Sequence, residues 1–474
     1  MNLQKSVVLL LSCLLVSSTV TFSAMFKPNP IISRGTGVTV KVSSGDGTGL
    51  NNKKFGMYET KKWAVTDNSW AAIKVVDGSY PGVFLVWGCA DTTWSDVIGV
   101  PKDSCSKKCE YPVDYEILTS ANSTDGSDGD WTSAVTVTGN TVNSRGHLVP
   151  FDGMKWIKMK ITKGKGSLDE IEVFDAANGA NDTWFFLGTK FTAVAMKGEM
   201  ASGWTQRDTN VPDSNFAALI NRRNPDYNPA VIRGGINCKV KTADVVRDLS
   251  KYLDVAGNVR FWAIELGTFD AWGGKADSAD AFKKNLQIII DSCKAHDILP
   301  VITQIPATNP QKISGKWQIN KAFTDAVTDL VTTNDLIPGP DLYAYFLSNY
   351  GAMDLANDGY LPNQYGDFEM QREWNLKMDS VVYKAAAVAA EVPRAAVPVS
   401  DMQNAFSITA QGDQLCFTAS MPGTVRMLSL DGKVVAMRSF AAGPVELHRS
   451  AVSGFCLLEI VSGGVKHVFP VMNY

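Results

Sequence analysis

The chain has 474 residues, of which 45% are hydrophobic and 20% are charged. These values are typical of globular proteins with hydrophobic cores, and the length predicts roughly two to four domains. The formal net charge of −3 argues against nucleic acid or an anionic membrane as the main partner, because both attract strongly basic proteins.

Residues 1–24 have the pattern of a secretory signal peptide. Lys5 is followed by an apolar run over residues 7–16, and small or polar residues lead to Ala24. We therefore expect cleavage near Ala24 and a secreted or cell-surface protein. A lipoprotein signal at Cys13 is the alternative. The run is too short for a membrane span, and no later stretch reaches the roughly 18 apolar residues that a span needs, so the protein is not expected to be integral to a membrane.

We expect an all-β domain over residues 25–178. Short β-rich runs at 82–87, 133–137 and 156–161 are separated by clusters of Gly, Asn, Asp and Ser, such as 123–129. This spacing predicts a β-sandwich or jelly roll.

Tryptophan is concentrated in this region, with seven of the twelve tryptophans before residue 185. Indole rings can bind sugars by stacking on a pyranose face, and four that lie near turn-rich sequence are candidates for that role: Trp63, Trp70, Trp94 and Trp131. The alternative for each is a place in the core of the sandwich, where large aromatic side chains are usually buried.

From residue 181 the pattern changes to strands that alternate with helices. The buried-strand runs are 184–187, 230–232, 259–264 and 299–305. Between them apolar residues recur at helical spacing, as at Phe282, Leu286 and Ile290. This alternation predicts an α/β domain over residues 181–384, with a flavodoxin-like parallel sheet that is covered by helices on both faces.

The remaining chain predicts a linker and a small β domain. Residues 385–403 are rich in Ala, Val and Pro, which is typical of a linker. Over residues 404–474 the pattern is again β, and Asp431-Gly432 between two strand runs is a strong hairpin signal. We expect a small C-terminal β-sandwich.

In an open α/β sheet, ligands bind at the carboxyl ends of the strands. These ends fall at 187–192, 232–238 and 266–270, and the segment 357–363 comes near the end of the domain.

In order, spacing and flanking residues these four segments resemble the four sequence blocks of SGNH (GDSL-type) hydrolases, a family of esterases. The resemblance covers about residues 181–382, and its features include Gly188, Gly267-Thr268, the run 337–343 and the frame from Asp358-Gly359 to Pro362-Asn363. It implies a nucleophilic Ser after the first strand, oxyanion donors after the second and third, and an Asp-x-x-His that completes the triad.

The resemblance fails at the residues that carry the chemistry. Gly188 and Asp358 are kept, but six family positions hold other residues: Thr189 for Asp, Lys190 for the nucleophilic Ser, Arg233 for Asn, Cys238 for the oxyanion Gly, Phe269 for the oxyanion Asn, and Leu361 for His. Acyl transfer by this route needs a nucleophile, a base and oxyanion donors together. Losing one donor alone costs about 100- to 1000-fold in rate. The resemblance therefore implies a member without catalysis.

Other readings of these residues remain open. We expect Lys190 to pair with Asp358, which lacks its His partner; ligand contact and a nucleophilic lysine are the alternatives. Cys238 is expected to be an inert thiol rather than a nucleophile, because no His is predicted beside it. Glu265 and Asp270 are either a glycosidase pair or hydrogen-bonded loop residues. With four His and no Cys-x-x-Cys, we expect neither a metal nor a cofactor.

Two further resemblances concern the flanking domains. The N-terminal β domain resembles the discoidin-like modules that precede some SGNH proteins. Residues 404–474 resemble the C-terminal sorting domains of type IX secretion, through Asp431-Gly432-Lys433 between strands and the runs 454–460 and 463–467. A generic accessory β-sandwich is the alternative.

Together these patterns predict a secreted SGNH-type protein that lacks catalysis and binds carbohydrate or a cell-wall polymer. One alternative is a carbohydrate esterase, a deacetylase of plant polysaccharide with a rearranged active site. A structural surface component with neither activity nor a glycan ligand is the other.

Overall fold

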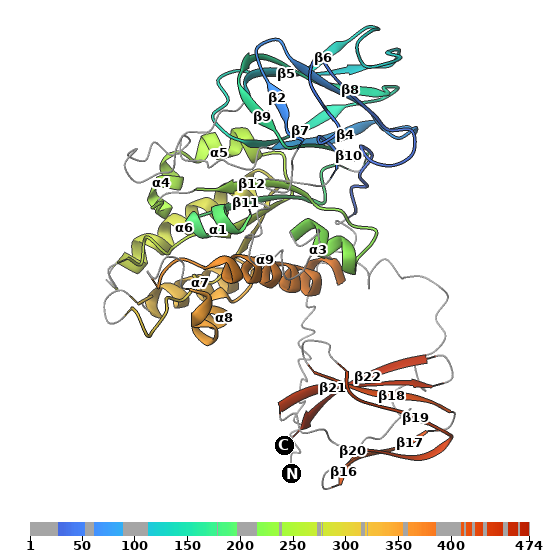
Figure 1. Ribbon diagram of the computed structural model, residues 1–474. Helices are drawn as coiled ribbons and strands as arrows, with labels where there is room; N and C mark the ends of the chain where they lie inside the picture. The colour runs from blue at the N-terminus through green and yellow to red at the C-terminus, as the bar shows by residue number, and fades with distance from the viewer. Residues whose placement is uncertain are drawn as a thin grey trace, which may run out of the picture. The chain divides into compact units, whose positions relative to one another are not determined.

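The computed structural model forms two compact units, residues 1–391 and 392–474 (Figure 1). The described residues of unit 1 are 27–52, 61–88, 112–177, 179–196, 216–236, 239–272, 276, 278–313, 318–319, 321–353 and 359–384. Those of unit 2 are 409–411, 414–419, 422–429, 434–448, 454–462 and 465–473. The predicted signal peptide and linker lie outside these ranges, as do Trp94, Cys238 and Asp358. The predicted domain boundaries stay predictions.

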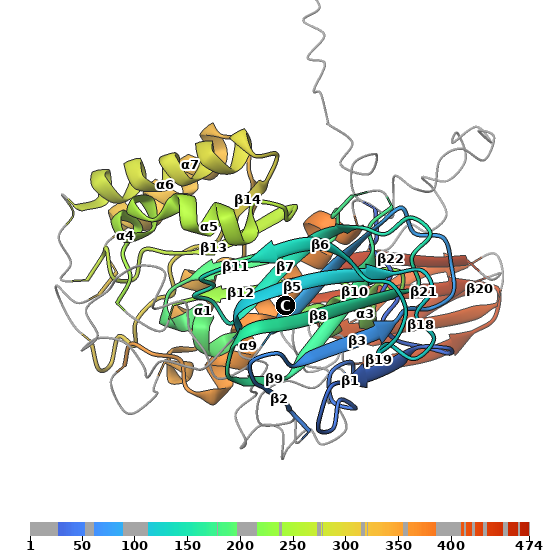
Figure 2. The same cartoon turned by 90° about the horizontal axis from the view of Figure 1, so that it is seen from above.

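The first domain of unit 1 consists of antiparallel sheets (Figure 2). One has five strands in the order β1 (Thr39–Val42), β3 (Trp70–Lys74), β8 (Trp156–Gly164), β5 (Pro112–Ser120) and β6 (Thr132–Val137). A second has the order β10 (Glu170–Asp175), β4 (Gly82–Gly88) and β7 (Ser144–Pro150), and β2 (Trp63–Val65) pairs with β9 (Gly166–Leu168). The predicted all-β domain is confirmed.

Alternating side chains of these strands fill a common core that includes Trp63, Trp87 and Tyr115. Trp87 Nε1 donates a hydrogen bond to the Tyr115 hydroxyl at 3.1 Å, and His147 Nε2 lies 2.8 Å from the same hydroxyl. Burial lowers the pKa of His147 to about 3. This histidine is therefore neutral near neutral pH and belongs to the core.

The second domain of unit 1 contains a parallel sheet of five strands. Their order is β12 (Ala230–Gly235), β11 (Thr183–Gly188), β13 (Phe261–Glu265), β14 (Leu299–Ile302) and β15 (Ile337–Pro338). The first four contain or overlap the predicted strand runs. The predicted α/β fold with a parallel sheet is confirmed.

Helices cover both faces of this sheet (Figure 1). One face packs on α4 (Thr242–Arg247), α5 (Leu249–Ala256), α6 (Ser278–Ala295) and α7 (Lys321–Thr333). The other packs on α1 (Lys190–Ala195), α3 (Phe216–Arg223), α8 (Leu342–Ser348) and α9 (Gln364–Met378), which a π-helical turn continues over Asp379–Tyr383. Successive side chains of β11 point to opposite faces: Phe185 and Leu187 lie in the first core, Trp184 and Phe186 in the second.

The sandwich and the α/β domain share one of these cores. Phe84 of the sandwich lies in the same hydrophobic cluster as Ile232 of β12. The two meet at Gly146, where an added Cβ would lie 2.6 Å from Phe84 Cζ and 2.7 Å from Ile232 Cδ1. At the rim of this contact Arg145 Nη2 pairs with Asp254 Oδ2 at 3.0 Å. Unit 1 therefore consists of a β-sandwich domain and an α/β domain that are joined by continuous apolar packing.

Unit 2 contains two antiparallel sheets. Their orders are β16 (Thr409–Gln411), β17 (Gln414–Ala419), β20 (Gly443–His448) and β19 (Val434–Phe440), β18 (Gly423–Ser429), β21 (Gly454–Ser462), β22 (Val465–Asn473). Leu415 and Phe417 of one sheet share a core with Val425 and Leu458 of the other. Strands β18 and β19 pair antiparallel, as the hairpin pattern predicts, although Asp431-Gly432 itself lies outside the described residues. The resemblance to a sorting domain stays a prediction.

Among the helices that the structure describes in either unit, none is both long and apolar enough to cross a membrane.

Candidate functional site

Three strands end side by side at one edge of the parallel sheet. Gly188 of β11 is in register with Gly235 of β12 and with Glu265 of β13. A Cβ on Gly188 would lie 2.1 Å from Thr192 Oγ1, and one on Gly235 would lie 2.3 Å from Ala193 N, so α1 packs directly on the strand ends. We call the residues around this edge the strand-end site: Thr189, Lys190, Lys239, Lys241, Glu265, Phe269, Asp270, Trp272 and Tyr360.

Glu265 is the buried acid of this site, with 1% of its surface exposed. Its Oε2 accepts hydrogen bonds from Thr189 Oγ1 at 2.7 Å, Thr189 N at 3.1 Å and Thr192 Oγ1 at 3.0 Å. Burial raises the pKa of Glu265 to about 7, although these donors act in the opposite direction. Its Oε1 is also buried and has no hydrogen-bond partner within the described part of the chain.

The kept Gly188 is followed by the two residues that replace the family's Asp and Ser. Thr189 is fully buried and its hydroxyl donates to Glu265, so it serves to hold the loop. Lys190 is half-buried and opens α1. In the ranges that the structure covers, no carboxylate pairs with Lys190. Its expected partner, Asp358, lies outside them, so the predicted ion pair stays a prediction.

Three aromatic rings stack on one another where the segment after β13 meets Tyr360. Trp272, which is 38% exposed, stacks on Tyr360 with ring centroids 4.4 Å apart and on Phe269 with centroids 5.8 Å apart. Phe269 is only 6% exposed, so at the family's oxyanion position it supports the stack from inside. Leu361, at the family's His position, packs against the core that α9 covers.

The stack brings together loops that are far apart in the sequence. The sequence pattern singled out Phe269 and Leu361 but not Trp272 and Tyr360. The available signal was weak: a Trp three residues after Phe269 in the loop that follows a buried strand, and a Tyr directly after the Asp358-Gly359 frame. Neither position predicts contact with the other.

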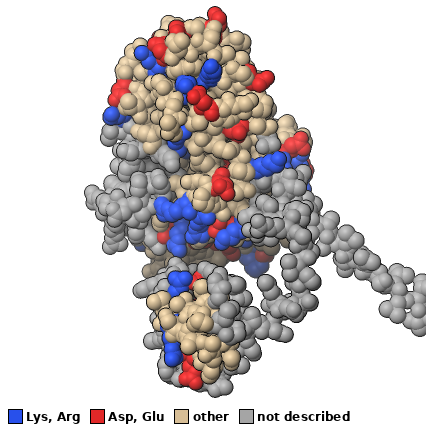
Figure 3. All heavy atoms as spheres, turned by 90° about the vertical axis from the view of Figure 1, so that its right-hand side faces the viewer, with Lys and Arg blue, Asp and Glu red and all other residues tan. Residues whose placement is uncertain are grey.

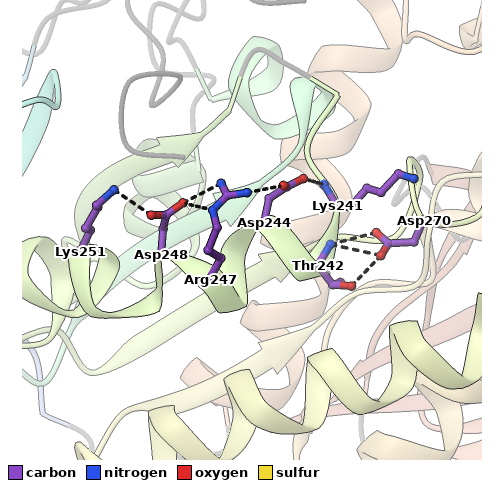
Figure 4. Close-up of polar contacts among 7 residues, drawn as sticks. All are labelled: Lys241, Thr242, Asp244, Arg247, Asp248, Lys251 and Asp270. Carbon is purple, nitrogen blue, oxygen red and sulfur yellow. Dashed lines mark hydrogen bonds and ion pairs between the residues drawn. The ribbon is translucent and has the colours of Figure 1, made fainter. Parts of the chain in front are cut away.

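Asp270 is bound to the start of α4 rather than to another acid. Its carboxylate accepts from Thr242 N at 3.1 Å and from Thr242 Oγ1 (Figure 4). Burial raises the pKa of Asp270, while Thr242 and Lys241 act against the rise. Because Glu265 holds α1 and Asp270 holds α4, both carboxylates have structural partners. This arrangement favours the hydrogen-bonded alternative over a glycosidase pair.

The four candidate tryptophans of the sandwich differ in their surroundings. Trp63 is fully buried and its Nε1 donates to Ser44 O at 3.1 Å, so the core alternative holds for this residue. Trp70 and Trp131 come together around Lys158, whose Nζ lies 4.5 Å and 3.6 Å from their ring centroids. Lys158 is 6% exposed, so it occupies the space between the two rings. Trp94 lies outside the described residues.

Metal-ligating side chains do not gather at this edge in the part of the chain that the structure describes. Over the described residues, no group of three or more His, Cys, Asp or Glu side chains is placed to hold a metal ion. Cys293 of α6 is a free thiol, and burial raises its pKa to about 12, so it is an inert core residue.

No family model matches the chain, and no curated protein matches it. Similar solved structures include an α/β hydrolase from the metagenome of Lake Arreo, Spain, with 15% identity over 43% of this chain and 97% of that chain, at a TM-score of 0.33. An acetylxylan esterase from Geobacillus stearothermophilus has 13% identity over 42% of this chain and 95% of its own, at a TM-score of 0.33.

A lipase/acylhydrolase from Enterococcus faecalis has 18% identity over 41% of this chain and 94% of its own, at a TM-score of 0.32. Each of these similarities covers less than half of this chain. The discoidin-like and sorting-domain resemblances stay predictions.

Proposed function

We propose that the chain is a secreted or cell-surface glycan-binding protein on an SGNH-type scaffold, and that it does not hydrolyse esters. The observation that carries the proposal is the exposed Trp272 stacked on Tyr360 at the strand ends. Binding sites for small molecules are lined by aromatic side chains with a few polar groups beside them, and in open α/β sheets they lie at this edge. A pyranose ring offers the flat C–H face that such aromatic rings bind.

The absence of hydrolysis is supported first by the residues after β11. A hydroxyl nucleophile needs access to the substrate and a base that takes its proton. The Thr189 hydroxyl is buried and donates to Glu265. The Lys190 ammonium is a point charge with no lone pair to attack a carbonyl. Thr189 and Lys190 are therefore better suited to structural support or to contact with a ligand than to acyl transfer.

The positions of the histidines are the second support. Of the four in the chain, His147 is buried in the sandwich and His448 belongs to unit 2, as does His467. His296 follows α6, where its Nδ1 lies 2.8 Å from Ser292 O. That helix end leads into the start of β14, at the opposite edge of the sheet from the strand-end site. Neither of the two histidines that the structure describes in unit 1 is therefore placed to act as base there.

Binding to a panel of plant and bacterial wall polysaccharides tests the proposal. The full chain should bind at least one of them, and Trp272→Ala should weaken that binding about tenfold, because a well-placed aromatic contact contributes about 1.4 kcal/mol. Trp272→Phe should retain most of the affinity, which separates loss of the ring from misfolding. The matched control is Trp131→Ala on the sandwich. The proposal fails if Trp272→Ala binds like the wild type, or if only Trp131→Ala loses binding.

The second candidate is a carbohydrate esterase that deacetylates plant polysaccharide with a rearranged site. Glu265 is the observation that favours it, because a carboxyl with a pKa near 7 can exchange protons near neutral pH. Such an enzyme would release acetate from aryl acetates or acetylated xylan. Turnover that disappears in Lys190→Ala would establish this alternative.

A further inference from the structure

We infer that the glycan held at the strand-end site is anionic, with carboxylate or sulfate groups that meet Lys239 and Lys241 beside the Trp272 ring. This inference rests on the proposed glycan-binding function and names the class of glycan.

Lys239 places an ammonium group above the aromatic stack. Its Nζ lies 5.5 Å from the centroid of the Trp272 ring, and the residue is exposed. This distance is near the outer limit of a cation–π contact, so the ring positions the ammonium while its N–H donors stay available. Within the described ranges, no carboxylate pairs with Lys239. A sugar on the aromatic stack would therefore have a cation within reach of its substituents.

Lys241 adds a second charge to the same loop. Its backbone N–H donates to Asp244 Oδ2 at 3.0 Å, while its exposed side chain extends on the side of Asp270 (Figure 4). Both oxygens of Asp270 already accept hydrogen bonds from Thr242. The loop between β12 and α4 contains both lysines and no acidic residue, and the neighbouring Asp244 pairs with Arg247, so the loop itself carries positive charge.

A second group of basic side chains in unit 1 differs from the two lysines because an acid partly neutralises it. Lys and Arg side chains gather on the face shown in Figure 3, on the side of the molecule where α3 lies in Figure 1. There α3 ends in Arg222 and Arg223. Arg223 Nη1 and Lys384 Nζ lie 3.2 Å and 3.1 Å from the buried carboxylate of Asp379, which partly neutralises the group. Lys239 has no such partner in the described structure and lies against an exposed aromatic ring.

The aromatic ring and the lysines supply complementary interactions. Stacking on Trp272 is the same for a neutral and an anionic sugar of equal shape. Only the anionic sugar also forms charge-assisted hydrogen bonds with the lysines, which are stronger than neutral ones. The site should therefore prefer the charged member of two otherwise matched polymers, and added salt should reduce that preference.

Two matched polymer pairs test this inference: polygalacturonate against its methyl-esterified form, and dextran sulfate against dextran. We expect the full chain to bind the anionic member of at least one pair about five- to tenfold more tightly. Lys239→Gln and Lys241→Gln should each remove about a two- to fivefold share of that preference, as is usual for an exposed ion pair. The polymer pair whose anionic member binds more tightly shows whether the site recognises carboxylate or sulfate groups.

The charge control is Lys294→Gln, which should leave the preference unchanged because Lys294 lies in the last turn of α6, at the opposite edge of the sheet. Trp272→Ala keeps both lysines and should still lose affinity for the anionic polymer. Equal binding of both members of each pair overturns the inference and leaves the glycan-binding function standing. Full binding of the anionic polymer by Trp272→Ala also overturns it, since charge alone would then explain the attraction. Failure to bind any glycan refutes the proposed function together with the inference.

Discussion

Replacing Glu265 by glutamine isolates the electrostatic contribution of the buried acid below the strand ends. The pKa of Glu265 is raised from 4.5 to about 7. In the unfolded chain the carboxyl ionises near its ordinary pKa, whereas in the folded protein it stays protonated until the pH approaches 7. Its stabilising contribution is therefore fully present below about pH 4.5 and is lost as the pH rises to about 7. At about 1.4 kcal/mol per pKa unit, the loss is about 3 kcal/mol.

Urea unfolding of the wild type and Glu265→Gln, at several values from about pH 4.5 to about pH 7.5, measures this loss. We expect the free energy of unfolding of the variant to rise by about 3 kcal/mol relative to that of the wild type across that pH range. A constant difference in the free energy of unfolding between the two proteins is also expected, because one polar group of the introduced glutamine still lacks a hydrogen-bond partner. Asp182 has a pKa near 7 as well, but it is present in both proteins and cancels.

A second variant checks the sign of this effect. Thr192→Val removes a donor that favours the charged carboxylate, so it should raise the pKa of Glu265 further and extend the loss of stability to higher pH. If the free energy of unfolding depends on pH in the same way in the wild type and in Glu265→Gln, the pKa of Glu265 is not raised in the folded protein.

Two other substitutions test the packing and the charge around the site. Gly146→Ala places a methyl group against Phe84 and Ile232 and should cost about 1–3 kcal/mol in urea unfolding; a fully stable variant would contradict the shared core. Asp270→Ala removes the acceptors of Thr242 and should cost about 1–2 kcal/mol. It should also tighten binding of the anionic polymer, because the strand-end site loses an acidic side chain; weaker binding by the folded variant would contradict the role of charge.

The fold could be predicted because its signals are local in the sequence. Runs such as 184–187 and 230–232 are continuous and apolar, which is typical of strands buried on both faces, and the helices between them have a regular apolar face. The shared core of sandwich and sheet could not be predicted. It depends on Gly146, a small residue whose role shows only when β7 lies against β12.

The location of the candidate site could be predicted from the sequence, but only some of the residues that line it could. Gly188 and the strand ends identified the edge, since parallel strands must end together. The Trp272–Tyr360 stack joins loops that are distant in sequence, and the position of Lys158 between Trp70 and Trp131 depends on strand pairing. Such contacts follow from tertiary packing, which the pattern of one sequence does not contain.

We propose that the strand-end site binds a glycan without cleaving it. The most direct measurement is calorimetric titration of the full chain with a partly acetylated polysaccharide, with acetate quantified in the same sample. We predict saturable binding that Trp272→Ala weakens about tenfold, and no acetate release above that of the polymer alone. Acetate release that depends on Lys190 would contradict the claim.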